Sequence, residues 1–356
     1  MRHIIQYTIL LLCCPLMTIA QDFGRHNWMQ HLDDSRTVAS LSIPGAHDAA
    51  TGEGLHMVAG FGKTQELSLA ALWDCGVRAF DLRPAVKGEE LHIYHGPVRT
   101  KVSFGKALEI LCDKLAEHPT EFVIVLMREE SDSENSTERA LWPQAVGKAI
   151  ENTGDKAAIF SPAMKVGDAR GKIIFISRNA YTGCNRGAII EGWNHSPQGT
   201  ANARITSLTD DATARLQMQD YYAPTDKEKQ KAKEEAVLQC LQRAASAPAD
   251  VWTINFLSGY SNRWLGFTPF ATTSGYKRNA ERIHPIVINS LAAKPQPTGI
   301  MMLDFAGCDK TGGGIWHWGC FKTLGAELVD KIIGQNFNHS IFALSLTRFA
   351  FRNPNG

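Results

Sequence analysis

The sequence of 356 residues predicts an α/β fold, namely a distorted (β/α)8 TIM barrel that occupies residues 21–356 as a single domain. Short apolar runs alternate with helical segments over most of the chain, as expected of repeated βα units. Polar and mostly charged residues follow these runs, and barrel active sites are built from several such strand ends. No internal repeat or low-complexity linker divides the chain.

The expected strands are short apolar runs, typical of strands buried on both faces. They lie at residues 38–43, 77–82, 91–94, 122–127, 172–177, 215–219, 251–257 and 300–305. The barrel should be irregular, because residues 77–82 and 91–94 leave no room for a helix between them. The Gly- and Asn-rich residues 181–203 are expected to form a rim loop.

Helices are indicated by apolar spacing and by capping signals. Phe104, Leu108, Leu111 and Leu115 follow a 4-3-4 spacing that places them on one helix face. A capping box over residues 225–228 opens a second helix. The last helix is expected at residues 324–333.

The first 20 residues differ from the rest of the chain. Arg2 and His3 precede an apolar run at residues 4–16, and small residues lie before Gln21, which is the pattern of a secretory signal peptide. We therefore expect a secreted or periplasmic protein without a transmembrane segment. Cys13 and Cys14 leave lipoprotein anchoring as an alternative. The net charge of +1 gives no general attraction to nucleic acid.

Six cysteines remain after residue 20, which is too few for a disulfide scaffold of this length. They are Cys75, Cys112, Cys184, Cys240, Cys308 and Cys320. Cys308 and Cys320 flank a Gly-rich loop and are the best candidates for a disulfide. No Cys/His spacing typical of zinc occurs, and no cofactor is expected.

The residues at the strand ends suggest acid–base chemistry on a phosphate. They are His47, Asp48, Arg83, His95, Arg128, Arg178, Asp220 and Asp304. Two histidines suit a reaction that removes one proton and delivers another. A carboxylate beside each would stabilise the imidazolium, and an arginine offers a fork for phosphate. The set indicates ribonuclease-type cleavage, in which an internal hydroxyl attacks phosphorus. His56, His92, His118, His195 and His284 are predicted to be structural.

Several blocks in this order resemble the bacterial phosphatidylinositol-specific phospholipases C, over nearly the whole chain after residue 20. The blocks are SIPGAHD (42–48), TQE (64–66), FDLR (80–83), HGP (95–97), GDARGKI (167–173), QDYY (219–222) and LDF (303–305). Tyr94 departs from the family, which has a second histidine there. The resemblance implies a distorted barrel and metal-independent cleavage of phosphatidylinositol to diacylglycerol and inositol 1,2-cyclic phosphate.

The resemblance also implies roles for individual residues. His47 is expected to be the general base for the inositol 2-hydroxyl, held by Asp304. His95 is expected to be the general acid, assisted by Asp48. Arg83 should bind the phosphate, the task of calcium in eukaryotic relatives, with Asp81 positioning that group.

By the same resemblance, Arg128, Arg178, Asp220 and Tyr222 should contact the inositol ring, with Arg128 replacing a lysine of the family. Phe61 and Trp264 lie in apolar rim segments and are predicted to touch the membrane that carries phosphatidylinositol. We expect a peripheral, monomeric enzyme. Members of the family can also release glycosylphosphatidylinositol-anchored proteins.

Two other classes remain open. One is a metal-dependent phosphodiesterase on a similar barrel, such as a glycerophosphodiester phosphodiesterase or a calcium-dependent phospholipase C, which would need acidic metal ligands. The other is a non-catalytic protein that binds an inositol lipid. Loss of activity in EDTA would favour the first class, and binding without turnover would favour the second.

Overall fold

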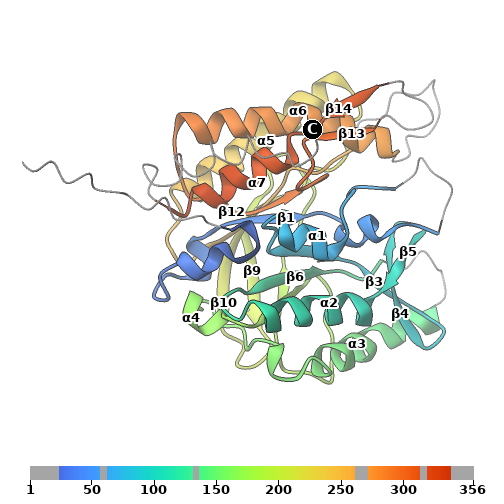
Figure 1. Ribbon diagram of the computed structural model, residues 1–356. Coiled ribbons are helices and arrows are strands. Elements are labelled where there is room, and N and C mark those ends of the chain that lie inside the picture. Colours follow the sequence, from blue (N-terminus) through green and yellow to red (C-terminus); the bar gives the residue numbers. More distant parts are fainter. Residues whose placement is uncertain (1–23, 57–61, 131–135, 261–271, 313–318, 338–356) are drawn as a thin grey trace, which may run out of the picture.

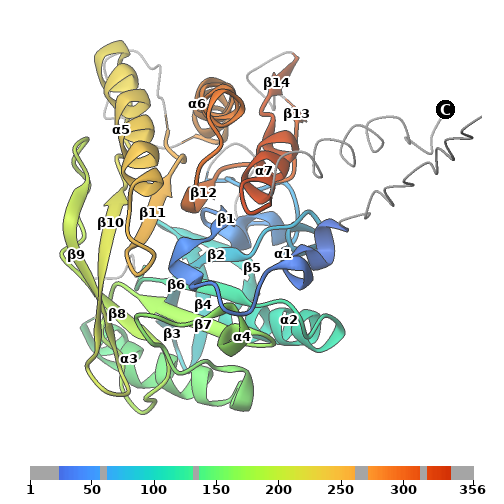
Figure 2. The same cartoon turned by 90° about the vertical axis from the view of Figure 1, so that its left-hand side faces the viewer.

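A closed barrel of strands with helices packed outside it forms the centre of the computed structural model, which describes residues 24–56, 62–130, 136–260, 272–312 and 319–337 (Figures 1 and 2). The predicted signal peptide, residues 1–20, lies outside this part. The strand order is β1-β12-β11-β10-β9-β8-β7-β6-β2. The barrel strands are β1 (Ser42–Ala46), β2 (Ala79–Leu82), β6 (Val123–Met127), β7 (Ile173–Ser177), β8 (Ala188–Glu191), β9 (Thr200–Ser207), β10 (Thr213–Gln219), β11 (Trp252–Phe256) and β12 (Gly299–Leu303).

The predicted fold class is confirmed, with three departures in detail. The run predicted as a strand at residues 38–43 is a 3-10 helix over residues 38–40, and β1 begins only at Ser42. The run at residues 91–94 belongs to β4 (Glu90–His95), which pairs with β3 (Pro84–Lys87) and β5 (Val98–Ser103) in a separate three-stranded antiparallel sheet. The segment expected as a rim loop, residues 181–203, contains β8 and the start of β9. Because β9 is antiparallel to both of its neighbours, the barrel is not fully parallel.

Helices cover the barrel on opposite sides (Figure 1). In that view α5, α6 and α7 lie above it, and α2 and α3 lie below it. The helices are α1 (Leu69–Asp74), α2 (Phe104–Glu117), α3 (Ser136–Glu151), α4 (Val166–Ala169), α5 (Lys227–Ala245), α6 (Thr273–Ala293) and α7 (Gly325–Gly334). The 3-10 helices are η1 (Arg25–His31), η2 (Val38–Ser40), η3 (Ala49–Glu53) and η4 (Gly154–Lys156), and β13 (Lys310–Gly312) and β14 (Cys320–Lys322) form a small hairpin.

The predicted helix faces are confirmed. Phe104, Leu108, Leu111 and Leu115 are all buried on α2. The cap of α5 is one residue later than predicted, because the Asp226 carboxylate accepts the hydrogen bond from the Lys229 N–H. Aspartate is among the strongest N-cap residues, so it takes the position that Thr225 was expected to hold.

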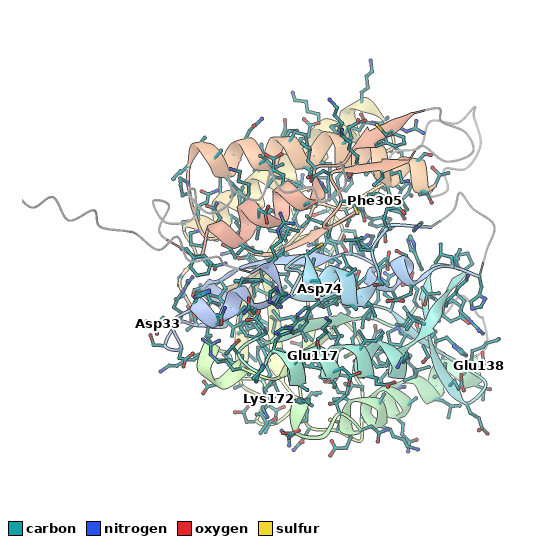
Figure 3. The ribbon with its side chains drawn as sticks, in the orientation of Figure 1. Asp33, Asp74, Glu117, Glu138, Lys172 and Phe305 are labelled. Carbon is teal, nitrogen blue, oxygen red and sulfur yellow. The ribbon has the colours of Figure 1, made fainter. Side chains whose placement is uncertain are left out.

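The core fills the barrel and the space under the helices. Phe305 is fully buried beyond β12, whereas charged residues such as Asp33 and Glu117 lie on the outside (Figure 3). At the amino-terminal end of the barrel strands, the buried ion pair of Arg78 and Glu121 joins Nη2 to Oε2 at 2.8 Å. Glu121 also accepts from the backbone N–H of Met29, so this pair attaches η1 to the barrel.

The predicted disulfide between Cys308 and Cys320 is wrong, because both are free thiols, as are the other four cysteines of the described residues. The register of the β13–β14 hairpin explains this. Cys320 pairs with Gly312, four positions beyond Cys308, and its side chain is exposed. Among the described residues, no helix is both long and apolar enough to span a bilayer.

Candidate active site

Three neighbouring barrel strands, together with β4 from a separate sheet, deliver the central side chains to one end of the barrel. His47 and Asp48 follow β1, Asp304 follows β12, and Arg83 follows β2, which itself carries Asp81. Since β1 pairs in parallel with both β12 and β2, these strand ends meet at the same edge. His95, by contrast, ends β4 of the three-stranded sheet and reaches the same place from outside the barrel.

The His47 ring lies between two carboxylates. Its Nδ1 is 2.8 Å from Oδ1 of Asp304, and its Nε2 is 3.1 Å from Oδ2 of Asp48. Asp304 is fixed in turn by the backbone N–H of Gly259, which donates to Oδ2 at 3.1 Å. This arrangement fixes the imidazole plane and leaves Nε2 as the atom that faces the other site residues.

Asp48 joins both histidines to the arginine. Its Oδ2 lies 3.2 Å from Nε2 of His95 as well as 3.1 Å from Nε2 of His47, and its Oδ1 is 2.8 Å from Nε of Arg83. The two histidine rings are 6.1 Å apart between centroids. A phosphate bound at Arg83 would therefore have an imidazole on either side.

Arg83 is held by acidic groups on more than one side. Its Nη2 is 2.8 Å from Oδ2 of Asp81, and its Nη1 is 3.6 Å from Oε1 of Glu130. Burial works against its charge, but Asp48 and Asp81 outweigh this and raise the pKa of Arg83 well above its ordinary value. The guanidinium is thus a fixed positive charge at the centre of the site.

Glu130 was not singled out from the sequence, although it lies two residues after the predicted strand end Arg128. It accepts from the backbone N–H of Gly96 at 2.9 Å and forms a short ion pair with Arg128. Burial opposes its charge, but Arg83 and Arg128 hold the pKa of Glu130 below its usual value. Glu130 therefore ties the turn after His95 to two cations of the site.

Burial and nearby charges determine the protonation states of His47 and Asp48. Burial, with a further contribution from Arg83, lowers the pKa of His47 well below its ordinary value. Burial also raises the pKa of Asp48 to about 6, although Arg83 and His95 oppose that rise. Near neutral pH, His47 therefore lacks a positive charge and can accept a proton.

A second group lies at the ends of β7 and β10. Arg178 Nη2 is 3.4 Å from Oδ2 of Asp220, and its guanidinium stacks 3.5 Å above the ring of Trp193. Trp193 Nε1 donates to the same carboxylate oxygen at 3.0 Å. The structure thus joins Arg178 and Asp220, and it adds Trp193, which the sequence offered no reason to choose.

His195 was predicted to be structural, yet it lies beside this second group. Its Nδ1 is 3.1 Å from Oδ2 of Asp220, and its ring centroid is 5.1 Å from that of Tyr222. Tyr222 is exposed. The predicted pair Asp220 and Tyr222 therefore lies together, with a histidine between the acid and the aromatic ring.

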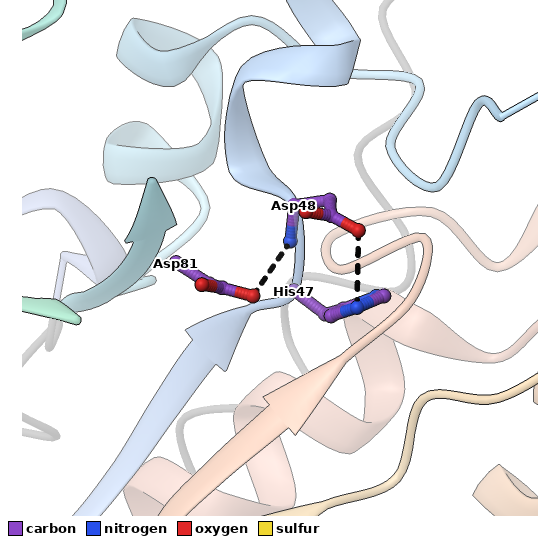
Figure 4. Close-up of side chains that lie close together, drawn as sticks. All are labelled: His47, Asp48 and Asp81. Atoms are coloured by element: carbon purple, nitrogen blue, oxygen red, sulfur yellow. Dashed lines mark hydrogen bonds and ion pairs between the residues drawn. The ribbon is translucent and has the colours of Figure 1, made fainter. Parts of the chain in front are cut away.

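A group that could hold a metal ion overlaps this site. Ligand atoms of His47, Asp48 and Asp81 lie within 4.8 Å of one another (Figure 4). However, the Arg83 guanidinium already contacts the carboxylates of both Asp48 and Asp81 at 2.8 Å. A cation bound by these two carboxylates would have to displace that contact, so these residues fit an arginine better than a metal ion.

The predicted site residues are thus brought together in two adjoining groups where the structure describes them. The roles assigned to them stay predictions. The predicted membrane contacts Phe61 and Trp264 lie outside the described residues.

Known proteins match most of the chain, although no protein-family model matches it. A 1-phosphatidylinositol phosphodiesterase of Listeria monocytogenes is 26% identical over 283 residues, covering 78% of this chain and 80% of that protein. One of Staphylococcus aureus is 26% identical over 319 residues, covering 86% and 93%.

Solved structures extend the comparison to the fold. A variant of the phosphatidylinositol-specific phospholipase C of Staphylococcus aureus superimposes with a TM-score of 0.66 at 23% identity, covering 87% of this chain and 97% of that one. The enzyme of Listeria monocytogenes gives a TM-score of 0.59 at 23% identity, with 88% and 100% covered. The resemblance predicted from the SIPGAHD and FDLR blocks is confirmed: in sequence and in fold, the chain is similar to the bacterial phosphatidylinositol-specific phospholipases C.

Proposed function

We propose that the protein is a phosphatidylinositol diacylglycerol-lyase, a phospholipase C that cleaves phosphatidylinositol to diacylglycerol and inositol 1,2-cyclic phosphate. The names of the relatives described above identify them as phosphodiesterases of phosphatidylinositol. The observation that carries the proposal is the position of Asp48, whose two oxygens connect Arg83 with His47 and His95.

The proposed reaction begins at His47. Its Nε2 takes the proton of the inositol 2-hydroxyl while Asp304 holds Nδ1, and the resulting oxygen attacks phosphorus. The bond between phosphorus and the glycerol oxygen breaks, and its electron pair stays on that oxygen. His95 delivers a proton from Nε2 to the oxygen, with Asp48 stabilising the imidazolium beforehand.

Arg83 supplies the charge stabilisation that this reaction needs. Its guanidinium is buried and preorganised by Asp48 and Asp81, so it can bind developing charge on the phosphate oxygens without rearrangement. We propose on this ground that no metal ion or other cofactor takes part.

The second group of residues is proposed to hold the inositol ring. Arg178 and Asp220 offer a donor and an acceptor for ring hydroxyls, and the exposed Tyr222 offers an aromatic face. Arg128 forms an ion pair with Glu130, which also contacts Arg83, and is proposed to contact the inositol ring as well. The same subsite would accept the inositol of a glycosylphosphatidylinositol anchor.

The test incubates the purified protein, residues 21–356, with phosphatidylinositol vesicles in EDTA and follows the products by phosphorus NMR. We expect a cyclic inositol phosphate signal, and we expect its loss in His47→Ala, by about 100-fold or more in rate. Product that forms with calcium but not in EDTA would establish the metal-dependent alternative. Lipid binding without product under either condition would establish the non-catalytic one.

We also propose that residues 1–20 direct export, so that the enzyme acts outside the cytoplasm as a monomer on the membrane surface. The apolar sequence around Phe61 and Trp264 supports the membrane contact. The double variant Phe61→Ala and Trp264→Ala should partition about 10-fold more weakly into phosphatidylinositol vesicles and keep its turnover of a soluble substrate. Unchanged partitioning in a sedimentation assay would contradict the membrane contact.

A further inference from the structure

The hydrogen bonds of His95 show which of its ring atoms carries the exchangeable proton. Nδ1 lies 2.6 Å from the backbone carbonyl oxygen of Gly62. A carbonyl can only accept, so Nδ1 must keep its hydrogen and donate it. Nε2 is therefore the atom of His95 that gains and loses a proton.

Among the described residues, Nε2 of His95 has two oxygen neighbours, of which one belongs to the set predicted from the sequence. Oδ2 of Asp48 is 3.2 Å away, and the hydroxyl of Tyr276 is 3.0 Å away. Tyr276 lies in the first turn of α6, and its ring centroid is 5.5 Å from that of His95 and 6.3 Å from that of His47. The hydroxyl is thus inside the site, close to both imidazoles.

The two neighbours differ in their freedom to move. Asp48 is 3% exposed and is bound through its other oxygen to Arg83, so its carboxylate cannot turn away without breaking that ion pair. A tyrosine O–H, in contrast, rotates about its C–O bond and can exchange one partner for another. When a leaving-group oxygen approaches Nε2, the Tyr276 hydroxyl beside it can therefore turn its hydrogen away from Nε2 and donate it to that oxygen.

We propose that Tyr276 is a catalytic residue that donates a hydrogen bond to the leaving-group oxygen of the substrate while His95 protonates it. This inference rests on the proposed function. When the bond between phosphorus and the glycerol oxygen breaks, the electron pair goes to that oxygen and the proton comes from Nε2 of His95. Tyr276 keeps its own proton and stabilises the charge that develops before the transfer is complete.

The surroundings of Tyr276 suit a group that donates and stays neutral. Burial, with a further contribution from Asp48, raises the pKa of Tyr276 well above its ordinary value, so its hydroxyl remains protonated. The ring packs against Tyr260, with centroids 6.2 Å apart. The neighbouring Lys277 is fixed by Glu66 at 2.9 Å and by the carbonyl of Gly312 at 2.7 Å, which anchors this turn of α6.

The test compares two leaving groups in wild type and Tyr276→Phe. Phosphatidylinositol loses an alcohol that is a poor leaving group, whereas inositol 1-(p-nitrophenyl phosphate) loses an acidic phenol that needs little help. We expect Tyr276→Phe to lower kcat on phosphatidylinositol roughly 10- to 100-fold and on the nitrophenyl ester less than about 3-fold. Tyr94→Phe is the matched control, because consecutive residues of a strand point to opposite faces and Tyr94 precedes His95 in β4.

Each other result overturns the inference. Equal losses on both substrates would show that Tyr276 only shapes the site, and unchanged rates would show that its hydroxyl takes no part. If wild type turns over neither substrate, the proposed function itself fails, which the wild-type arm reveals separately. If Tyr276→Phe does not fold, 3-fluorotyrosine at position 276 keeps the ring and makes the hydroxyl a stronger donor. The rate on phosphatidylinositol should then change while the rate on the nitrophenyl ester stays the same. An unchanged rate on phosphatidylinositol would overturn the inference.

Discussion

At the scale of single residues, Asp48 is the group on which the site depends most. It adopts a left-handed backbone with φ of 43°, a conformation that aspartate tolerates better than most residues do. This conformation turns the chain directly after His47 and places the Asp48 carboxylate between the two imidazoles. Burial also raises the pKa of Asp48 to about 6, so its carboxylate takes up a proton at a higher pH than an exposed aspartate does.

The pH dependence of catalysis should reflect this. Asp48 must be ionised to stabilise the His95 imidazolium, and burial raises the pKa of Asp48 to about 6. The pKa of His47 lies well below its ordinary value, so the base is lost only at lower pH. We therefore expect kcat/KM to fall as the pH drops through about 6, with the slope of a single proton.

Initial rates on a soluble substrate between about pH 4.5 and pH 8 would measure this limb. In Asp48→Asn, the rate should be lower by about 100-fold and the limb near 6 should disappear. A limb that persists unchanged in this variant would assign it to another group.

The site residues that the sequence analysis missed differ in how clearly the sequence marks them. Glu130 lies two positions after Arg128, so a strand end read a little further would have included it. Trp193 and His195 lie between β8 and β9, and the apolar run that precedes them, residues 188–190, was too short to mark a strand end among the surrounding Gly and Asn residues. Tyr276 lies within a helix and reaches His95 only through the packing of α6 against the barrel, which no local pattern reveals.

At the scale of elements, the positions of most strands could be predicted from the sequence, but the sheet that each strand joins could not. A run of apolar residues identifies a strand because it must be buried, as in β6, where every residue is buried. β4 differs, because most of its residues are only partly buried or exposed. The polar residues Glu90, His92 and Tyr94 alternate along it, which is typical of an antiparallel strand with one open face. That alternation could have placed it outside the barrel.

The longest barrel strand that was missed, β9, is polar. β9 has the sequence TANARITS, and its exposed residues leave too little apolar surface for a run to be recognised. It pairs antiparallel with β8 and β10, its immediate neighbours along the chain, so it was missed because of its composition and not because its partners are distant. Cys308 and Cys320 were the best candidates for a disulfide because they flank a Gly-rich loop. Spacing in the sequence, however, does not reveal the strand register, which places Cys320 opposite Gly312.

At the scale of the whole molecule, a buried histidine remote from the proposed chemistry should affect folding stability. His284 on α6 is fully buried, and its Nδ1 donates to the carbonyl of Thr323 at 2.5 Å. Burial lowers the pKa of His284 to about 4, although Thr323 and Asp309 oppose the shift. The folded state therefore holds this ring neutral, while the unfolded chain takes up a proton below its ordinary pKa.

The sign of the effect follows from that difference. The contribution of His284 to stability is complete above about pH 6.5 and is lost as the pH falls toward 4, by on the order of 3 kcal/mol in total. Urea unfolding of wild type and His284→Asn at neutral and acidic pH would measure it. The decrease in the free energy of unfolding should be smaller in the variant by about 2 kcal/mol, and equal decreases would contradict the prediction.

The pairing of β1 with β12 determines when, during synthesis of the chain, the site can be completed. Nδ1 of His47 and the carboxylate of Asp304 meet across 257 positions of the chain. During synthesis on the ribosome, His47 and Asp48 emerge long before β12 and the acid that holds the imidazole. A chain that ends before β12 thus has the histidine without its partner. Any activity that requires this pair is withheld until β12 and Asp304 have been synthesised.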